Sequence, residues 1–149
     1  MRHYLQFGRF GFNLSGTQAL VMGILNITPD SFSDAGQYQH LEFAISRAEQ
    51  MIIDGVDIID IGGESSRPGA PPLPLQHELA RVMPVLYALR DCGKPLSVDT
   101  YKPQVMREAI LAGADNLTAE VERLQPDAIL IDTDSPSRDT LENLAAMNK

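Results

Sequence analysis

Three apolar segments of the chain each lead into polar residues whose side chains could bind a ligand. The first segment ends at Asn26, the second leads into a loop that carries Ser66 and Arg67, and the third ends at Asp99. In parallel α/β proteins, the loops at the carboxyl ends of the strands are where ligands bind. We therefore take these four residues as the candidate site.

Each of these side chains has a chemical use and a structural alternative. The amide oxygen of Asn26 can ligate a hard cation such as Mg²⁺ without adding charge, although Asn is also common in turns. The guanidinium of Arg67, with the Ser66 hydroxyl beside it, suits carboxylate or phosphate oxygens, although most Arg side chains are simply solvated. Asp99 can accept hydrogen bonds from a ligand or cap the helix that follows. The residue types alone leave these alternatives open.

The elements that must position these residues follow from apolar spacing and from turn residues. A helical pattern follows Asn26 and stops at Gly55, a second pattern covers residues 76–91, and a third helix is expected from Pro103 to Gly113. Strands and helices therefore alternate, as in the βαβ units of a parallel sheet. The expected strands cover residues 19–25, 56–61 and 95–99, and a β-hairpin is expected over residues 4–14.

The fold class is α/β, with a parallel β-sheet and an N-terminal β-hairpin. A length of 149 residues indicates a single domain over residues 1–149, whereas a complete (β/α)8 barrel takes about 250 residues. The architecture is then either half of a TIM (β/α)8 barrel or an open flavodoxin-like sheet. A half-barrel would expose two strand edges and an apolar face, so we expect a homo-oligomer that forms through the exposed sheet edges.

Composition excludes several functions. The formal net charge of −8 disfavours binding to nucleic acid or to anionic membranes. No segment approaches the ~20 apolar residues of a membrane span, and the single cysteine, Cys92, allows no intrachain disulfide. We therefore expect a cytoplasmic protein. The three histidines have no paired spacing and receive no metal or acid–base role, and Asp57 and Asp60 are expected to be structural.

The loop sequences resemble a known family. Residues 22–34 read Met-Gly-Ile-Leu-Asn-Ile-Thr-Pro-Asp-Ser-Phe-Ser-Asp, residues 62–70 read Gly-Gly-Glu-Ser-Ser-Arg-Pro-Gly-Ala, and Asp99 precedes Thr100. With their flanking segments, residues 1–115 resemble the amino-terminal half of dihydropteroate synthase. That resemblance implies a transferase of folate biosynthesis that joins a pterin diphosphate to p-aminobenzoate with Mg²⁺.

The resemblance also implies a role for each candidate residue. Asn26 would lie near the Mg²⁺ and the diphosphate, Ser66 and Arg67 would help to bind p-aminobenzoate, and Asp99 would bind the pterin. The family's next pterin ligand is an Asn, and Thr118 stands in its place. The family's second-half ligands have no counterpart, so we expect weak diphosphate or Mg²⁺ binding rather than full activity from a monomer.

The chain changes character near residue 115. Residues 116–125 have the spacing of an amphipathic helix, and residues 127–132 read as a strand. Residues 116–149 resemble a response-regulator receiver of the antiterminator type, which would make Asp132 a phosphoacceptor, although the receiver's acidic pair and its Lys are absent. The chain then reads as a splice of two α/β families, or as a diverged synthase fragment whose tail matches receivers by chance. Three functions follow: an enzyme-derived ligand binder, a non-catalytic chimera or designed scaffold, and a signalling module phosphorylated at Asp132.

Overall fold

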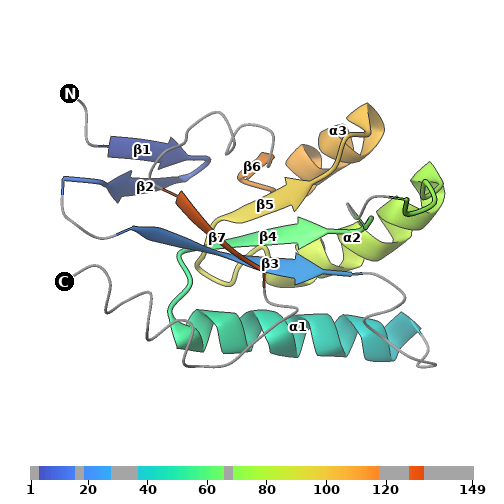
Figure 1. Cartoon of the computed structure of the whole chain (residues 1–149), viewed down its shortest axis with the longest axis horizontal. Coiled ribbons are helices and arrows are strands. Elements are labelled where there is room, and N and C mark those ends of the chain that lie inside the picture. The colour runs from blue at the N-terminus through green and yellow to red at the C-terminus, as the bar shows by residue number, and fades with distance from the viewer. Residues whose placement is uncertain (1–3, 16–18, 28–36, 66–68, 118–127, 133–149) are drawn as a thin grey trace.

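The computed structural model describes the chain in five stretches and shows one parallel sheet with a separate hairpin (Figure 1). It covers residues 4–15, 19–27, 37–65, 69–117 and 128–132, with residues 37–39, 116–117 and 128–132 described through their backbone alone. The elements are β1 (Tyr4–Phe7), β2 (Phe10–Asn13), β3 (Leu20–Asn26), α1 (Gln37–Asp54), β4 (Ile58–Gly62), α2 (Leu75–Leu89), β5 (Leu96–Asp99), α3 (Pro103–Ala112), β6 (Asn116–Leu117) and β7 (Ala128–Asp132). Among these helices, none is both long and apolar enough to cross a membrane.

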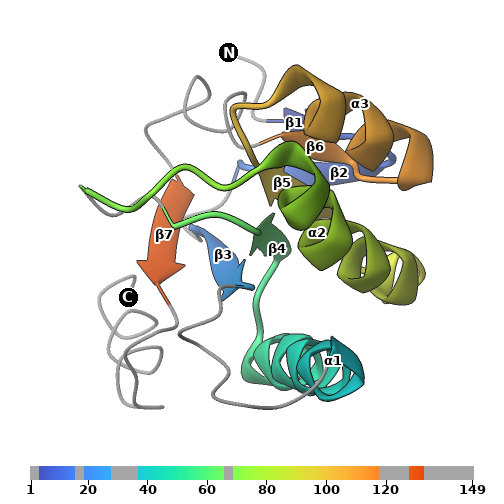
Figure 2. The same ribbon diagram turned by 90° about the vertical axis from the view of Figure 1, so that its right-hand side faces the viewer.

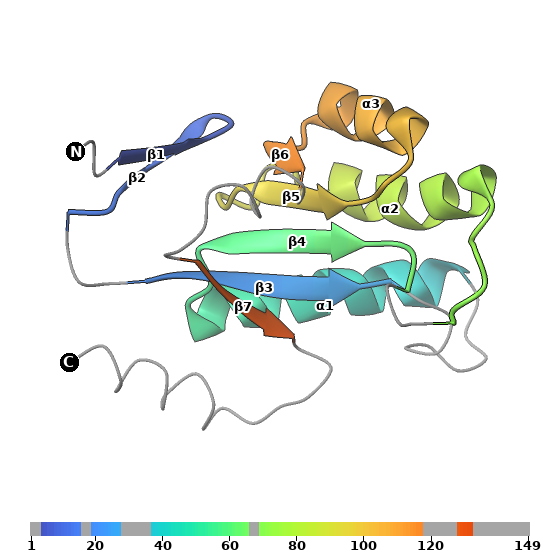
Figure 3. The same cartoon turned by 45° about the horizontal axis from the view of Figure 1, so that its top comes forward.

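The sheet has five parallel strands in the order β6-β5-β4-β3-β7. From β3 to β6 each strand is added beside the previous one, and β7 then pairs with the free side of β3. The arrowheads of β3, β4 and β5 point to the same end of the sheet, where their following loops gather (Figure 3). This common end brings together the loops that carry the candidate residues.

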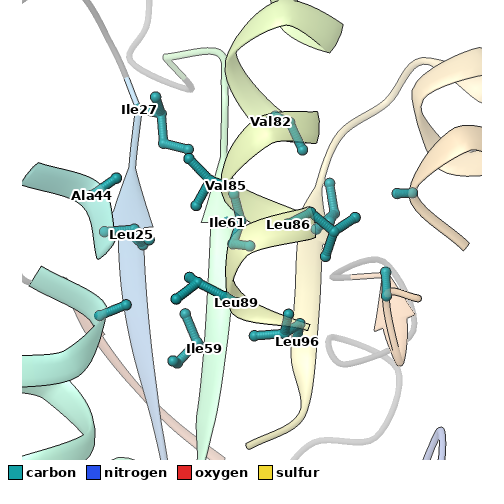
Figure 4. Close-up of a cluster of buried hydrophobic side chains, with 14 of the residues drawn as sticks. Leu25, Ile27, Ala44, Ile59, Ile61, Val82, Val85, Leu86, Leu89 and Leu96 are labelled. Atoms are coloured by element: carbon teal, nitrogen blue, oxygen red, sulfur yellow. The ribbon is translucent and has the colours of Figure 1, made fainter. Parts of the chain in front are cut away.

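All three described helices pack on one face of the sheet (Figure 2). Alternate strand residues point to opposite faces, and those on this face join apolar residues of α1, α2 and α3 in one cluster. Figure 4 shows Leu25, Ile59, Ile61 and Leu96 of the sheet packed against Val82, Val85, Leu86 and Leu89 of α2. An open flavodoxin-like sheet carries helices on both faces, so the described part has the arrangement of a half-barrel.

The opposite face, which we call the inner face, is covered near the amino ends of the strands by the hairpin. Phe7 of β1 is 1% exposed and packs with Met22 of β3 and Ile58 of β4. The hairpin turn contacts the sheet through Gly8, which has a φ of 57° and lies so close to Asp115 that a Cβ would sit 2.5 Å from the Asp115 Cβ. The hairpin therefore closes one end of the inner face and leaves the carboxyl end open to the loops.

An ion pair fixes the same turn to the sheet. The Arg9 Nε lies 3.2 Å from the Asp115 Oδ1, and the other oxygen of that carboxylate accepts the Leu96 amide at 3.1 Å. Asp115 in this way joins the hairpin turn to the start of β5.

The structure confirms the α/β fold, the parallel sheet and the hairpin. It also confirms the predicted third helix, which begins at Pro103 and ends before Gly113, whose φ is 106° and whose amide caps the last turn. One prediction was wrong: Asn116 and Leu117 form β6, not the start of a helix. The open edge of β5 offers unpaired backbone groups, and pairing with them outweighs the local helical pattern. The rest of that predicted helix lies outside the described residues.

Candidate functional site

The carboxyl ends of β3, β4 and β5 place three residues in one row across the sheet. Asn26 is in register with Gly62, and Gly62 is in register with Asp99. Two strand spacings separate the outer residues of the row, which puts their Cα atoms about 10 Å apart. Because these positions alternate with the core residues Leu25 and Ile61, the row lies on the inner face. Two of the four predicted site residues are thus brought together.

Gly62 leaves room for the Asn26 side chain. A Cβ at Gly62 would lie 3.3 Å from the Asn26 Oδ1, which is tighter than ordinary contact. The amide oxygen therefore leans over a position that has no side chain. Mg²⁺ in phosphate sites keeps several waters and takes one or two protein ligands besides the phosphate oxygens, so a single amide oxygen fits that role. Among the described side chains, no group of three or more His, Cys, Asp or Glu residues is placed to hold a metal ion.

A second polar row lies two residues before the first along β4 and β5. Asp60 of β4 and Ser97 of β5 are in register, and they are 2% and 0% exposed. Asp57, just before β4, accepts the Val21 amide at 2.9 Å and thereby ties β4 to β3. The prediction that Asp57 is structural is confirmed, while Asp60 is buried beneath the row that carries Asn26 and Asp99.

A cluster of charged side chains joins the loops after β4 and β5. The Lys102 Nζ contacts Glu64 Oε2 and also Glu78 Oε2, the latter at 2.6 Å. Glu64 Oε1 accepts the Leu73 amide at 2.9 Å and the Tyr101 hydroxyl at 3.1 Å. Glu78 belongs to α2 and is 0% exposed. The Glu64 carboxylate therefore contacts Leu73 and the adjacent pair Tyr101 and Lys102, and Lys102 extends the cluster to α2 through Glu78.

The charges in this cluster hold one another in the ionised state. Burial alone would raise the pKa of Glu64, but hydrogen bonds from Lys102, the Leu73 amide and Tyr101 outweigh burial and lower that pKa below its ordinary value of 4.5. Burial alone would lower the pKa of Lys102, but its hydrogen bonds to Glu64 and Glu78 outweigh burial and raise that pKa. Both groups are charged at neutral pH.

The loop after β4 also lies directly on α2. A Cβ at Gly63 would sit 2.7 Å from the Val82 Cγ2, so only glycine fits there without displacement. The Arg81 Nη1 donates to the Gly63 carbonyl at 2.9 Å. The path of the chain out of β4 is thus set by the surface of α2.

Replacing Glu64 by glutamine is expected to lower the free energy of unfolding by about 1–3 kcal/mol at neutral pH, because the hydrogen bonds to a charged acceptor weaken. The pKa of Glu64 is lowered in the folded protein, so its stabilisation is full above the ordinary value of 4.5 and is lost as the pH falls through the folded-state pKa. Urea unfolding of both proteins at about pH 7 and about pH 3 measures this difference. The exposed Glu108→Gln is the control, and a Glu64 effect that persists unchanged in acid would contradict the expectation.

The other predicted residues have different outcomes. Ser66 and Arg67 lie outside the described residues. Asp132 ends β7, where its backbone is in register with Ile24. The N-cap position of α3 is Lys102, not Asp99, so the capping alternative for Asp99 does not hold.

Sequence reasoning missed Glu64, Glu78 and Lys102. Their contacts span 24 and 38 residues of sequence, and no local spacing signals them. A usable signal was the Glu within the quoted Gly-Gly-Glu-Ser-Ser-Arg string, together with the Lys that directly precedes Pro103.

The sequence that carries this row matches a known family of enzymes. A family model named pterin binding enzyme matches residues 22–128, well over half of the chain. The chain belongs to the pterin-binding enzyme family. Within that family it is 55% identical over 98 residues to the dihydropteroate synthase of Bacillus subtilis. This match covers 65% of this chain and 34% of the relative. It is also 54% identical over 107 residues to a probable bifunctional folylpolyglutamate synthase/dihydropteroate synthase of Halobacterium salinarum, covering 72% of this chain and 13% of the relative.

Solved structures of pterin-binding enzymes share the fold. A Xanthomonas albilineans dihydropteroate synthase with 4-aminobenzoic acid is 45% identical, with a TM-score of 0.70, and the match covers 77% of this chain and 42% of the other. A Burkholderia cenocepacia dihydropteroate synthase complexed with 7,8-dihydropteroate is 42% identical, with a TM-score of 0.65, and the match covers 93% and 49%.

The chain is therefore a dihydropteroate synthase-like member of the family that spans less than half the length of these relatives. The family match continues past residue 115 through β6 to residue 128. The resemblance of the last residues to a receiver stays a prediction.

Proposed function

We propose that the chain binds a pterin diphosphate at the row formed by Asn26, Gly62 and Asp99. The observation that carries this proposal is the register that sets an amide and a carboxylate on either side of a glycine at the carboxyl edge of a parallel sheet. Asp99 is exposed there and accepts hydrogen bonds from the nitrogen donors of the pterin ring. The Burkholderia relative, whose structure holds 7,8-dihydropteroate, supports this ligand class.

Mg²⁺ belongs to the diphosphate end of the ligand. Asn26 would hold the ion through its amide oxygen, with the diphosphate oxygens and water as the other ligands. Held there, Mg²⁺ would supply positive charge that stabilises a departing diphosphate. Because Gly62 has no side chain, the Asn26 Oδ1 is not crowded at this end of the sheet.

We propose p-aminobenzoate as the second ligand. Ser66 and Arg67, which stand in the loop after β4 by sequence, are assigned to it through the family resemblance. The Xanthomonas relative is solved with 4-aminobenzoic acid, which supports this assignment. A guanidinium suits its carboxylate because two N–H groups can donate to two oxygens.

We propose that complete synthesis of dihydropteroate needs more than one copy of this chain. Among the described strands, β6 and β7 stand at the two ends of the sheet order, and two residues of β6 are described. Unpaired strand edges favour association with another chain. A homo-oligomer that joins single-domain protomers at these edges would supply additional groups to the site.

Replacing Asp99 by asparagine is expected to weaken pterin binding about 10–100-fold, because a charged acceptor of two ring donors becomes a neutral one with a misplaced donor. Isothermal titration of a pterin with inorganic diphosphate and Mg²⁺ into each protein measures this. Asp91→Asn, at an exposed side chain after α2, is the matched control and should leave affinity unchanged. A folded wild-type chain that binds no pterin would overturn the proposal and favour a scaffold without biochemical activity.

A second candidate, phosphorylation at Asp132, rests on one observation. β7 is a parallel strand that ends at this residue, as the phosphoacceptor strand of a receiver does. Mg²⁺-dependent labelling by an acyl phosphate that is lost in Asp132→Asn would support this function. Absence of labelling in the wild-type chain would remove it.

A further inference from the structure

We propose that Tyr101 and Lys102 are positioning residues that act through Glu64. Through the Glu64 carboxylate they join Glu64 and Leu73, which lie between β4 and α2, to the residues that directly follow the end of β5, where Asp99 lies. The role of this link in ligand binding rests on the proposed function, because the segment from Glu64 to Leu73 contains the residues assigned to p-aminobenzoate and the strand end contains the residue assigned to the pterin. None of these side chains was identified by the sequence patterns.

The Glu64 carboxylate links Glu64 to Leu73. Its Oε1 accepts the amide of Leu73, nine residues further along, at 2.9 Å. The two ends of the segment are thereby held at one point. The same oxygen accepts the Tyr101 hydroxyl at 3.1 Å, so that this point is also joined to the loop that follows β5.

Lys102 connects α2 to the contacts at the Glu64 carboxylate, which we call the Glu64 junction. Its ammonium group contacts Glu64 and lies 2.6 Å from the carboxylate of Glu78, a residue of α2 that is 0% exposed. The Lys102 backbone amide donates to the Thr100 Oγ1 at 3.2 Å, and Pro103 begins α3 directly afterwards. The lysine is therefore constrained at its backbone and at its charged end.

The charge balance requires this lysine. Two carboxylates meet one ammonium group, with side chains 15% and 0% exposed for Glu64 and Glu78 and 14% for Lys102. Among the described residues the buried Glu78 Oε1 has no hydrogen-bond partner, and Lys102 compensates the buried charge through the other oxygen. Without it, the two carboxylates would repel one another and the Glu64 junction would shift.

A shift at this junction would move Glu64 and Leu73 relative to Asp99, which ends β5 two residues before Tyr101. The segment and the strand end must hold two ligands at a fixed separation for one to attack the other. Displacement of a positioning group by about 1 Å can lower the reaction rate about 100-fold. Loss of the junction should therefore weaken the ligand bound by the segment while leaving the ligand bound at Asp99.

The test uses two variants and one matched control in the full chain. Tyr101→Phe removes one hydrogen bond from a side chain on a residue that is 65% exposed, so folding is not at risk. The double variant Lys102→Met with Glu78→Leu removes the charge link and leaves no unpaired buried carboxylate on α2. Tyr87→Phe removes the hydroxyl of another exposed tyrosine, on α2, and is the control.

Two quantities are measured for each protein. Titration of p-aminobenzoate in the presence of a pterin, inorganic diphosphate and Mg²⁺ should show about 3–10-fold weaker binding in Tyr101→Phe and, because hydrogen bonds between charged groups are lost, up to about 100-fold weaker binding in the double variant. Pterin affinity should stay within about twofold, which a general loss of structure would not allow. Hydrogen exchange at the Leu73 amide should become faster in both variants and not in Tyr87→Phe.

The outcomes separate this inference from the proposed function. Equal loss of both ligands, or unchanged p-aminobenzoate affinity in both variants, would overturn the inference. If the wild-type chain binds neither ligand, the proposed function fails and Leu73 exchange alone decides: faster exchange in both variants supports the link, and unchanged exchange overturns it.

Discussion

Replacing Lys102 alone by methionine is expected to lower the free energy of unfolding by about 3–5 kcal/mol, because it strands a buried carboxylate. Glu78 is 0% exposed, and one of its oxygens has no hydrogen-bond partner in the part of the chain that the structure describes. Removing the ammonium group leaves the other oxygen without its 2.6 Å contact. Urea unfolding at neutral pH, followed by circular dichroism, measures the change.

A second substitution distinguishes a buried-charge effect from lost packing. Adding Glu78→Leu to Lys102→Met should recover most of the lost stability, because a matched apolar pair often replaces a buried ion pair at no net cost. Lys94→Met, at a half-buried lysine after α2, is the control and should change stability by less than about 0.5 kcal/mol. A double variant as unstable as Lys102→Met would show that the charge is not the cause.

Replacing Phe7 by alanine is expected to lower the free energy of unfolding by about 3–5 kcal/mol, since a fully buried aromatic side chain is lost and a cavity remains. Phe7 is 1% exposed and packs with Met22 and Ile58 on the inner face. The remaining contacts of the hairpin include the Arg9–Asp115 ion pair and the packing of Phe12. The measurement is the same urea titration.

Tyr4→Ala is the matched control for Phe7→Ala, because it removes an aromatic side chain of the same strand that is 59% exposed. It should cost well under 1 kcal/mol. Equal effects of the two substitutions would mean that the hairpin does not depend on the packing of Phe7 against the sheet.

Elements with both a local pattern and local end signals could be predicted from the sequence. α3 is the clearest case, because Pro103 has the φ that a first helical turn requires and Gly113 adopts the positive φ that ends it. The hairpin and the parallel sheet followed from apolar spacing in the same way. The short strand β6 could not be predicted, since among the described strands it pairs with β5 alone and its own residues fit a helix equally well.

The candidate site also contains residues that local patterns predict and residues that they do not. Asn26 and Asp99 could be placed because each ends an apolar strand, and parallel strands bring such ends together. The cluster of Glu64, Glu78 and Lys102 could not be found, because a contact between a loop, a helix and a second loop depends on how the helix packs. Its members look like ordinary solvated charges in the sequence.

The position of β7 has a consequence for the order in which the protein folds. β3 pairs with β4 through a short crossover, but its pairing with β7 joins Leu20 to Ala128, about a hundred residues apart along the chain. Contacts of such long sequence separation form late and carry a larger loop-closure cost. Until they form, β3 is an apolar strand with an open edge, which is a template for pairing with other chains. Nascent or partly unfolded chains should therefore aggregate through β3, and any ligand or partner that holds β7 in place should suppress that aggregation.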